Sequence, residues 1–576
     1  MDKNSPVYTR KTECHDCYKC VRHCVPKSIR VSDGSASIIS DACIACGVCV
    51  NICPAGAKSI RDDTVKVREL LRGNDPVYVS LAPSWKAHFG AKAGQKLITA
   101  LIKLGFTGIS ETALGAQQVS SMTGRILHEA DNGIYISSAC PVAVEFIEKY
   151  VNNPNCRVMD LLSPAQVHAR MLHRFYGDNI KVVFLGPCIG KKKESARTPE
   201  LLDAALTFTE FENWLKEAGL DMKKMPESAG GFVPEPAEEG NLYPIEGGMI
   251  STIMEQATAK DIIYLPLAGL NNLASVLGSA KPEPDRKIFI EALACDNGCI
   301  NGPGCSKDNQ LIHLADIAAL RSENYRSSLE RKIEVSGKTT QQMPPAINKP
   351  VDDDKLTAVL RNIGKYSRND ELNCGSCGYS TCRQCAAAIL EKKAEPAMCV
   401  SYLRKLAQKK ANALIKYIPA GVVVFDRKLK IVEANRNFSK LFGPEVEKIF
   451  DASDCLAGAN LKKIVPFHNL FNTVLETGSD LQRQNYVCDD RIFDIYIFNI
   501  EPHRVVGAII KDITSLEISR EQVAEHARKI ILKNIMTVQT IANCLGEHMA
   551  DTEILLREVS RKYQGQPNIR QHGESA

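Results

Sequence analysis

The sequence predicts a multidomain chain that combines α+β and α/β architecture. Its 576 residues exceed what one hydrophobic core supports, because domains usually contain about 100 to 200 residues. Many of its 22 cysteines gather in spaced groups near the N-terminus and after residue 370. Between these groups, apolar strand-like runs alternate with helical stretches, which is typical of an α/β domain. We expect five segments: residues 1–66, 75–325, 355–408, 412–515 and 516–576.

The composition excludes several classes of protein. Hydrophobic residues make up 44% and charged residues 24%, which are the proportions of an ordinary globular chain. The formal net charge is only +5, and no basic block is large enough to predict nucleic-acid binding. No apolar run approaches the roughly 18 residues of a membrane span, and the first residues lack the pattern of an export signal. We therefore expect a cytoplasmic protein that binds neither nucleic acid nor membrane.

The N-terminal cysteines form a duplicated comb. Each copy reads C-x2-C-x2-C-x3-C, and the second begins 29 residues after the first. Three thiolates two residues apart can hold three corners of one cubane while the fourth reaches the neighbouring cluster, as in two-cluster ferredoxins. Zinc knuckles are the alternative, although zinc sites typically use two C-x2-C pairs rather than two triplets. This comb predicts two 4Fe-4S clusters, one on Cys14, Cys17, Cys20 and Cys53 and one on Cys43, Cys46, Cys49 and Cys24.

A third group of cysteines follows residue 370. Its first three cysteines lie in the segment C-G-S-C-G-Y-S-T-C, and the two glycines of this segment let the backbone fold tightly around a cluster. A zinc site is the alternative here, and Cys385 could replace one ligand, although its place on a predicted helix favours a small buried residue. Four thiolates suffice for one cubane, so we assign a third 4Fe-4S cluster to Cys374, Cys377, Cys382 and Cys399.

Four further cysteines are scattered between these groups. Cys140 and Cys188 each follow a strand-like apolar stretch. Cys295 and Cys299 lie in a glycine-rich segment, whose glycines permit the backbone to approach a bulky group closely. Ligands gathered from strand ends suit the crevice at the carboxyl edge of an α/β sheet. The sequence therefore predicts a second kind of metal site in residues 75–325.

The segments around these cysteines resemble the three signature segments of the iron-iron hydrogenases. In that family the three segments have the consensus sequences T-S-C-C-P, M-P-C-x-x-K-x-x-E and E-x-M-x-C-x-x-G-C-x-x-G-G-G. Here residues 137–141 read S-S-A-C-P, residues 186–194 read G-P-C-I-G-K-K-K-E, and residues 291–304 read E-A-L-A-C-D-N-G-C-I-N-G-P-G. The resemblance covers roughly residues 1–320. It implies that the 4Fe-4S part of an H-cluster binds to Cys140, Cys188, Cys295 and Cys299.

The resemblance also implies the rest of the cofactor. Cys299 would bridge to a diiron subsite that carries carbon monoxide, cyanide and an azadithiolate, and that dedicated maturases insert. Lys191 and Ser84 would donate hydrogen bonds to the two cyanides. Outside the motif, Lys191 would be interpreted as a solvated lysine and residues 82–84 as an ordinary strand end. Other residues implied to surround the cofactor are Ala82, Pro83, Glu194, Gly186 and Leu293.

Departures from the family pattern predict slow chemistry. Ala139 stands where the family has the cysteine that relays protons to the bridging amine, and a methyl group carries no proton. Residues 112–128 contain no Asp or Glu, although the family places carboxylates of its proton path there. Gly186 and Leu293 replace two methionines that pack on the diiron subsite, which changes the volume and polarity of the pocket. We therefore expect a site that binds or senses hydrogen while turning it over slowly.

The C-terminal part resembles a signalling module. Short strand-like runs, an Asn-rich turn and a closing strand make residues 412–515 similar to a PAS domain, and we expect neither His468 nor Cys455 to ligate a haem or flavin. No ATP-binding domain follows, so the chain is not expected to be a kinase by itself. Packing of one amphipathic helix on the PAS domain is one interpretation of the last segment. A coiled coil or a partner helix is the other, because heptad spacing relates Ile531, Ile535, Val538, Ala542, Leu545 and Met549.

Together these features favour a sensory iron-iron hydrogenase of low activity. H2 would set the redox state of the H-cluster, three accessory 4Fe-4S clusters would exchange electrons, and the PAS domain would signal to a kinase or phosphatase. The other expected partners are a ferredoxin-like electron carrier, the maturases and a second copy of the chain. Two alternatives are a metabolic hydrogenase linked to ferredoxin and a non-enzymatic iron-sulfur carrier or assembly protein without the diiron subsite.

Overall fold

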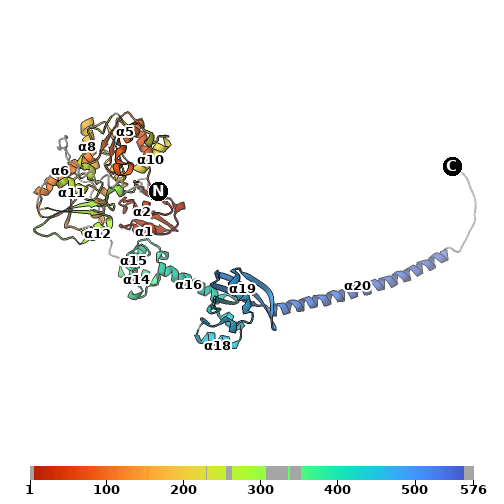
Figure 1. Cartoon of the computed structure of the whole chain (residues 1–576). Coiled ribbons are helices and arrows are strands. Elements are labelled where there is room, and N and C mark those ends of the chain that lie inside the picture. Colours follow the sequence, from red (N-terminus) through yellow and green to blue (C-terminus); the bar gives the residue numbers. More distant parts are fainter. Residues whose placement is uncertain are drawn as a thin grey trace, which may run out of the picture. The chain divides into compact units, whose positions relative to one another are not determined.

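A computed structural model divides the chain into two units, residues 1–403 and 404–576 (Figure 1). Among the described helices, none combines the length and the apolar character that crossing a bilayer requires. Residues 306–325, the end of the expected central segment, lie outside the described ranges. The structure describes residues 5–151, 153–228, 230–254, 262–305, 335–337, 352–453 and 455–563.

The N-terminal cysteines lie on short helices and loops beside two small antiparallel sheets. β1 pairs with β4, and β2 pairs with β3. α1 and α2 begin 29 residues apart, the same offset as the two cysteine combs, and each follows a residue with left-handed backbone, Tyr18 and Gly47. The elements of this region are β1 (Val7–Thr9), α1 (Lys19–His23), β2 (Ile29–Ser32), β3 (Ser35–Ile38), α2 (Val48–Ile52), β4 (Lys58–Ile60) and α3 (Thr64–Arg72).

Two parallel four-stranded sheets form the middle of the first unit, which agrees with the α/β architecture that the alternating pattern predicts. Their strand orders are β10-β9-β5-β6 and β11-β12-β7-β8. Several strands are buried along their whole length, because helices cover both faces of parallel sheets. The strands are β5 (Val77–Leu81), β6 (Gly108–Glu111), β7 (Gly133–Ile136), β8 (Cys156–Val158), β9 (Lys181–Gly186), β10 (Ala204–Thr207), β11 (Ile262–Ala268) and β12 (Lys287–Leu293).

Nine named α-helices of the described residues surround these sheets. In α8, Ala165, Ala169 and Leu172 recur at spacings of four and three and pack into the core of the first sheet. Ser163 and Gln166 cap the start of this helix reciprocally. The helices are α4 (Trp85–Phe89), α5 (Gly94–Lys103), α6 (Ala113–Glu129), α7 (Pro141–Phe146), α8 (Pro164–Tyr176), α9 (Gly190–Arg197), α10 (Phe208–Glu217), α11 (Gly248–Met254) and α12 (Leu270–Ser279).

A neutral histidine joins the first sheet to α8. His168 is fully buried between Ser80 of β5 and Ser110 of β6, and each hydroxyl lies 2.7 Å from one ring nitrogen. The Ser80 hydroxyl also lies 2.8 Å from that of Thr112. Burial lowers the pKa of His168 to about 3, so the ring stays neutral. A neutral ring can donate to one serine and accept from the other, and the network fixes the ends of both strands.

A buried lysine joins the N-terminal region to the central sheets. The side chain of Lys192 is fully buried at the start of α9. Its Nζ donates to Asp63 Oδ2 at 3.2 Å, to Glu210 Oε1 at 2.7 Å and to the carbonyl oxygen of Ala205 at 2.9 Å. Asp63 precedes α3, whereas the other two acceptors belong to the central part. Two carboxylates therefore compensate one ammonium inside the protein.

The cysteines after residue 370 lie in a small helical region beside the N-terminal one. This region contains α14 (Asp353–Asn362) and α15 (Cys382–Leu390). The Val31 N–H of β2 donates to the carbonyl oxygen of Lys393 at 2.9 Å. Val21 of α1 belongs to the same apolar cluster as Met398. The first and third cysteine combs are therefore parts of one packed body.

The second unit contains a five-stranded antiparallel sheet of order β14-β13-β17-β16-β15. Asn435 accepts hydrogen bonds from the N–H groups of Val422 and Phe438 and so fixes the predicted Asn-rich turn. Figure 1 shows α20 in blue as one long helix. The elements are α16 (Val400–Tyr417), which begins in the first unit, β13 (Gly421–Asp426), β14 (Ile431–Ala434), α17 (Arg436–Leu441), α18 (Pro444–Ser453), α19 (His468–Thr477), β15 (Leu481–Cys488), β16 (Arg491–Glu501), β17 (Val505–Asp512) and α20 (Thr514–Tyr563).

Replacing Lys192 with methionine should destabilise the central part of the first unit. The variant leaves Glu210 buried without its ion pair to Lys192 and leaves Asp63 with Arg61 alone, which should lower the free energy of unfolding by about 3 to 5 kcal/mol. Denaturant unfolding followed by tryptophan fluorescence measures this, because Trp85 and Trp214 are both buried there. Lys66→Met is the control, since Lys66 is exposed and should change stability by less than about 0.5 kcal/mol. Equal midpoints for the two variants would contradict the role given to Lys192.

His168 should make the stability of the first unit depend on pH. Its pKa is about 3 in the folded protein and near 6.5 in an unfolded chain, so below pH 6.5 only the unfolded chain gains a proton. Stability is complete above that pH and falls as the pH falls, by about 1.4 kcal/mol between pH 7.5 and 5.5. In His168→Gln this loss should disappear. Unfolding free energies at both pH values test it, and identical pH dependence in the variant would show that the ring does not supply the effect.

Candidate cofactor site

The four scattered cysteines meet at the carboxyl ends of parallel strands. Cys140 follows β7, Cys188 follows β9, and Cys295 and Cys299 follow β12. All four line one cavity of about 380 Å³, hereafter the thiol cavity. Cys46 of the N-terminal comb lies on the wall of the same cavity. The strand-end positions therefore bring together thiols from three loops and two sheets.

Burial keeps three of these thiols, Cys188, Cys295 and Cys299, protonated in the absence of a metal. It raises the pKa of Cys188 to about 11 and raises those of Cys295 and Cys299 well above the ordinary thiol value, and neighbouring thiols add to the rise. The Lys191 ammonium opposes the rise at Cys188 and Cys299. A metal must therefore displace protons from buried sulfurs when it binds. A cationic iron-sulfur core fits such a set, because it replaces several protons at once.

The glycines of residues 291–304 serve close packing of protein on protein. Gly298 has φ of +101°, and a Cβ added there would lie 2.3 Å from the carbonyl oxygen of Pro244. A Cβ on Gly302 would lie 2.8 Å from the Pro187 side chain. The bulky group that the sequence predicted beside these two glycines is thus the neighbouring backbone and the loop of Cys188. This packing brings the Cys299 loop against the Cys188 loop.

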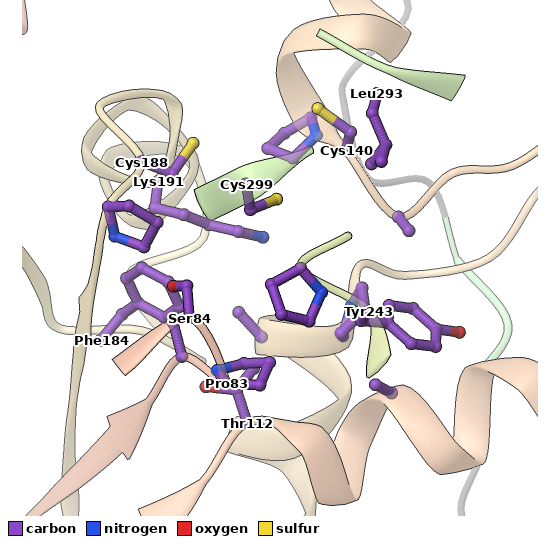
Figure 2. A pocket seen from close by; sticks show the side chains of 18 residues that line it. Pro83, Ser84, Thr112, Cys140, Phe184, Cys188, Lys191, Tyr243, Leu293 and Cys299 are labelled. Atoms are coloured by element: carbon purple, nitrogen blue, oxygen red, sulfur yellow. The ribbon is translucent and has the colours of Figure 1, made fainter. Parts of the chain in front are cut away.

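A second cavity, hereafter the apolar cavity, lies beside Cys299 and has a volume of about 640 Å³ (Figure 2). Cys140 and Cys188 line it together with Cys299, so the two cavities share three thiols. Most of its other walls are apolar. Six predicted site residues lie on these walls: Ala82, Pro83, Ser84, Ala139, Lys191 and Leu293.

Lys191 is a buried, paired cation. Its Nζ donates to Glu194 Oε2 at 2.6 Å and to Ser163 Oγ at 2.8 Å. Lys191 is only 7% exposed, so the alternative of a solvated lysine is wrong. Figure 2 shows its amine pointing into the apolar cavity near Cys299. A fixed ammonium at this wall can donate to a small anionic ligand.

Ser84 offers a second donor. It follows β5 and immediately precedes α4. Its Oγ is buried, and no partner for it is found among the described residues. A buried hydroxyl without a partner is costly, so its place on an apolar wall suits a ligand that accepts a hydrogen bond. Ser84 and Lys191 together fit the diiron subsite that the sequence resemblance implies.

Gly186 and Glu194 do not line the apolar cavity. Phe184 lies on the wall near the position expected for Gly186, and a Cβ on Gly186 would lie 2.6 Å from the Phe184 ring and 2.7 Å from Ala82. The small residue therefore admits the aromatic ring. Glu194 acts one step away, through its ion pair with Lys191.

The sequence did not single out three wall residues, Thr112, Phe184 and Tyr243. Thr112 directly follows β6. Because the predicted ligands also follow strands, this position could have identified Thr112 as a residue of the site. Tyr243 lies in an irregular segment without such a signal. Figure 2 shows its hydroxyl pointing away from the cavity, where it lies 2.8 Å from Ser120 Oγ. The aromatic face, rather than the phenol group, therefore borders the cavity.

The third cysteine comb surrounds a separate small cavity of about 360 Å³. Its four predicted ligands and Cys385 all line this cavity. A hydrogen bond from the buried Cys385 thiol lowers the pKa of Cys377 to about 6. Five thiols thus surround this cavity, whereas one cubane needs only four thiolate ligands. In this arrangement Cys385 donates a hydrogen bond to the predicted ligand Cys377.

Three regions match models of known protein families. Residues 6–54 match the 4Fe-4S dicluster domain, and residues 370–401 match an Fe-S cluster model. Residues 75–303 match the family described as iron only hydrogenase large subunit, C-terminal domain. These residues include the four cysteines of the thiol cavity.

Several curated proteins are similar to the chain. Iron hydrogenase 1 of Clostridium pasteurianum is 25% identical over 48% of this chain and 59% of its own length, and the NADP-reducing hydrogenase subunit HndD of Solidesulfovibrio fructosivorans is 26% identical over 50% and 58%. The cytosolic Fe-S cluster assembly factor NAR1 of Eremothecium gossypii is 25% identical over 46% and 76%. The chain thus spans about three fifths of the length of the two hydrogenases. It is therefore a hydrogenase-like iron-sulfur protein, and its similarity to the iron-only hydrogenase large subunit lies in residues 75–303.

Proposed function

We propose that the chain is a sensory iron-iron hydrogenase that reacts slowly and reversibly with H2 and passes its redox state to a signalling partner. One observation carries the proposal: the apolar cavity beside Cys299 presents the donors Ser84 and Lys191 but has Ala139 where the related enzymes have a proton-relaying cysteine. The donors suit an anionic metal ligand, whereas the methyl group supplies no proton.

The two cavities correspond to the two parts of an H-cluster. Cys140, Cys188, Cys295 and Cys299 would hold the 4Fe-4S part in the thiol cavity, and Cys299 would also reach the diiron subsite in the apolar cavity. When bound, the diiron subsite would supply the metal chemistry that splits or forms H2. Lys191, Ser84 and the apolar walls would orient the cofactor ligands and exclude water.

The walls explain why turnover would be slow. A proton leaving the apolar cavity meets the methyl group of Ala139 instead of a thiol. Lys191 is held in place by an ion pair with Glu194 and a hydrogen bond to Ser163. The Thr112 hydroxyl is bonded to a network that ends on the neutral, fully buried His168. Each of these groups positions ligands better than it delivers protons.

Electrons would travel through the N-terminal clusters. Cys46 lies on the wall of the thiol cavity, and its charge acts on Cys295. The cluster that contains Cys46 would therefore be next to the H-cluster. A ferredoxin-like carrier would exchange electrons with the accessory clusters that lie farther from the H-cluster. The third comb would hold one further accessory cluster.

The second unit would carry the signal. Its antiparallel sheet, with helices between the second and third strands, supports assignment of residues 412–515 to a PAS domain. On α20, Ile531, Ile535 and Val538 are 56%, 49% and 64% exposed, and the side chains of the other three heptad residues lie outside the described ones. Burial of these apolar side chains would favour a second copy of the chain or a kinase or phosphatase partner.

A non-enzymatic assembly role is the second candidate. The similarity to the assembly factor NAR1 favours it, and so does the absence of a relay group at Ala139. Such a protein would hold the four cubanes without a diiron subsite. The presence of that subsite separates the two candidates.

Infrared spectroscopy of the full chain after treatment with hydrogenase maturases tests the proposal. Cyanide and carbonyl bands should appear in the natural protein and disappear in Cys299→Ala, because this variant loses the bridging thiolate. Cys156→Ala is the matched control, since Cys156 lies on β8 outside both cavities, and its bands should match those of the natural protein. A natural protein with complete cubanes but without these bands would favour the assembly role.

Ala139→Cys should accelerate H2 turnover. A thiol at this wall restores a proton relay, and relay groups contribute roughly 10²-fold to 10⁴-fold where proton transfer limits the rate. Film voltammetry of the matured variants measures the catalytic current. Ala139→Val serves as the control because it changes the volume without adding a proton donor. An unchanged current in Ala139→Cys would mean that protons enter by another route.

A further inference from the structure

Lys58 is a buried cation among the N-terminal cysteines. It lies at the start of β4 and is 4% exposed. Its Nζ donates to Thr9 Oγ1 at 2.7 Å and to the carbonyl oxygen of Ala36 at 2.5 Å. Both acceptors are neutral, and no carboxylate among the described residues forms an ion pair with Lys58. The ammonium thus lacks the counter-charge that a buried lysine normally requires.

Lys58 lies beside cysteines of both combs. Ala36, whose carbonyl oxygen accepts the Lys58 hydrogen bond, belongs to one buried cluster with Cys20, and Cys14, Cys24 and Cys49 pack against that cluster. The Lys58 charge acts on Cys14, Cys20 and Cys49. Cys14 and Cys20 belong to one predicted cluster, whereas Cys49 belongs to the other. Lys58 therefore lies near both clusters and interacts with more ligands of the first.

Cluster charge completes the argument. Four thiolates around a 4Fe-4S core carry a net charge of about −2 when oxidised and about −3 when reduced. A nearby cation stabilises the more negative form more strongly, and burial reduces the screening of this interaction. The polar partners of Lys58 hold its ammonium in place.

We infer that Lys58 raises the reduction potential of the cluster on Cys14, Cys17, Cys20 and Cys53. Lys58 is a positioning charge: it binds no iron and makes the one-electron reduction of this cluster more favourable. An electron that reaches the N-terminal region is then held on this cluster. The inference depends on the proposed function only in requiring clusters at the two combs, and it does not require the diiron subsite.

Redox titration followed by electron paramagnetic resonance tests this inference on the full chain, produced without maturases and loaded with iron and sulfide. In Lys58→Gln, which keeps a hydrogen-bond donor but loses the charge, the first cluster to be reduced should titrate at a more negative potential. Lys58→Arg keeps the charge and should restore most of the shift. Lys66→Met is the matched control because it removes an exposed lysine charge from the adjacent α3.

Iron content, measured for every variant, separates loss of a cluster from a change in its potential. Equal potentials in Lys58→Gln and the natural protein, at equal iron content, would overturn the inference. An equally negative shift in Lys58→Arg would assign the effect to packing and also overturn it. If Lys58→Gln binds less iron, Lys58→Met provides the same comparison of potentials. A natural protein without clusters would defeat both this inference and the accessory-cluster part of the proposed function, whereas missing cyanide bands would defeat only the proposed hydrogenase.

Discussion

The three consecutive lysines at the start of α9 fix the candidate site, because each pairs with a carboxylate of a different element; Lys191 and Lys192 are buried and Lys193 is partly buried. Lys191 pairs with Glu194 beside the apolar cavity, Lys192 pairs with Asp63 and Glu210, and Lys193 pairs with Glu145 of α7. The helix is thereby attached to the cofactor wall, the N-terminal region and the helix after Cys140. Cys188 lies two residues before this helix, so the same ion pairs help to determine where its thiol lies. Removing the Lys191 charge would leave the buried Glu194 without this ion pair, whereas Asp63 keeps Arg61 and Glu145 keeps Lys149 and Arg197.

Much of the fold could be predicted because its signals are local. Apolar runs identified the strands before Cys140 and Cys188, and the similarity of residues 75–303 to a known family agrees with the resemblance read from short segments. Two four-stranded sheets, rather than one, could not be foreseen, because strand pairing depends on contacts between distant residues. That Phe184, rather than Gly186, lies on the cavity wall could not be foreseen for the same reason. Spacing identifies a candidate ligand, but packing decides whether a neighbouring residue reaches the cavity.

Polar groups near the cofactor site differ in what they can do. Lys191 and Ser84 are fixed donors on an apolar wall, whereas His168 is kept neutral by its burial and lies behind Thr112. This arrangement favours stable ligand geometry over rapid exchange of protons with solvent. The role inferred for Lys58 applies the same principle to electrons, since a fixed charge changes an equilibrium without itself reacting. The proposed sensory function would need such equilibria more than it would need speed.

The length of α20 has a mechanical consequence. Its 50 residues extend for about 75 Å at the usual helical rise. A rigid rod of this length acts as a lever: a tilt of about 10° at Thr514 would displace the far end by roughly 13 Å. Angular changes too small to disturb a hydrophobic core would thus become movements larger than a helix diameter.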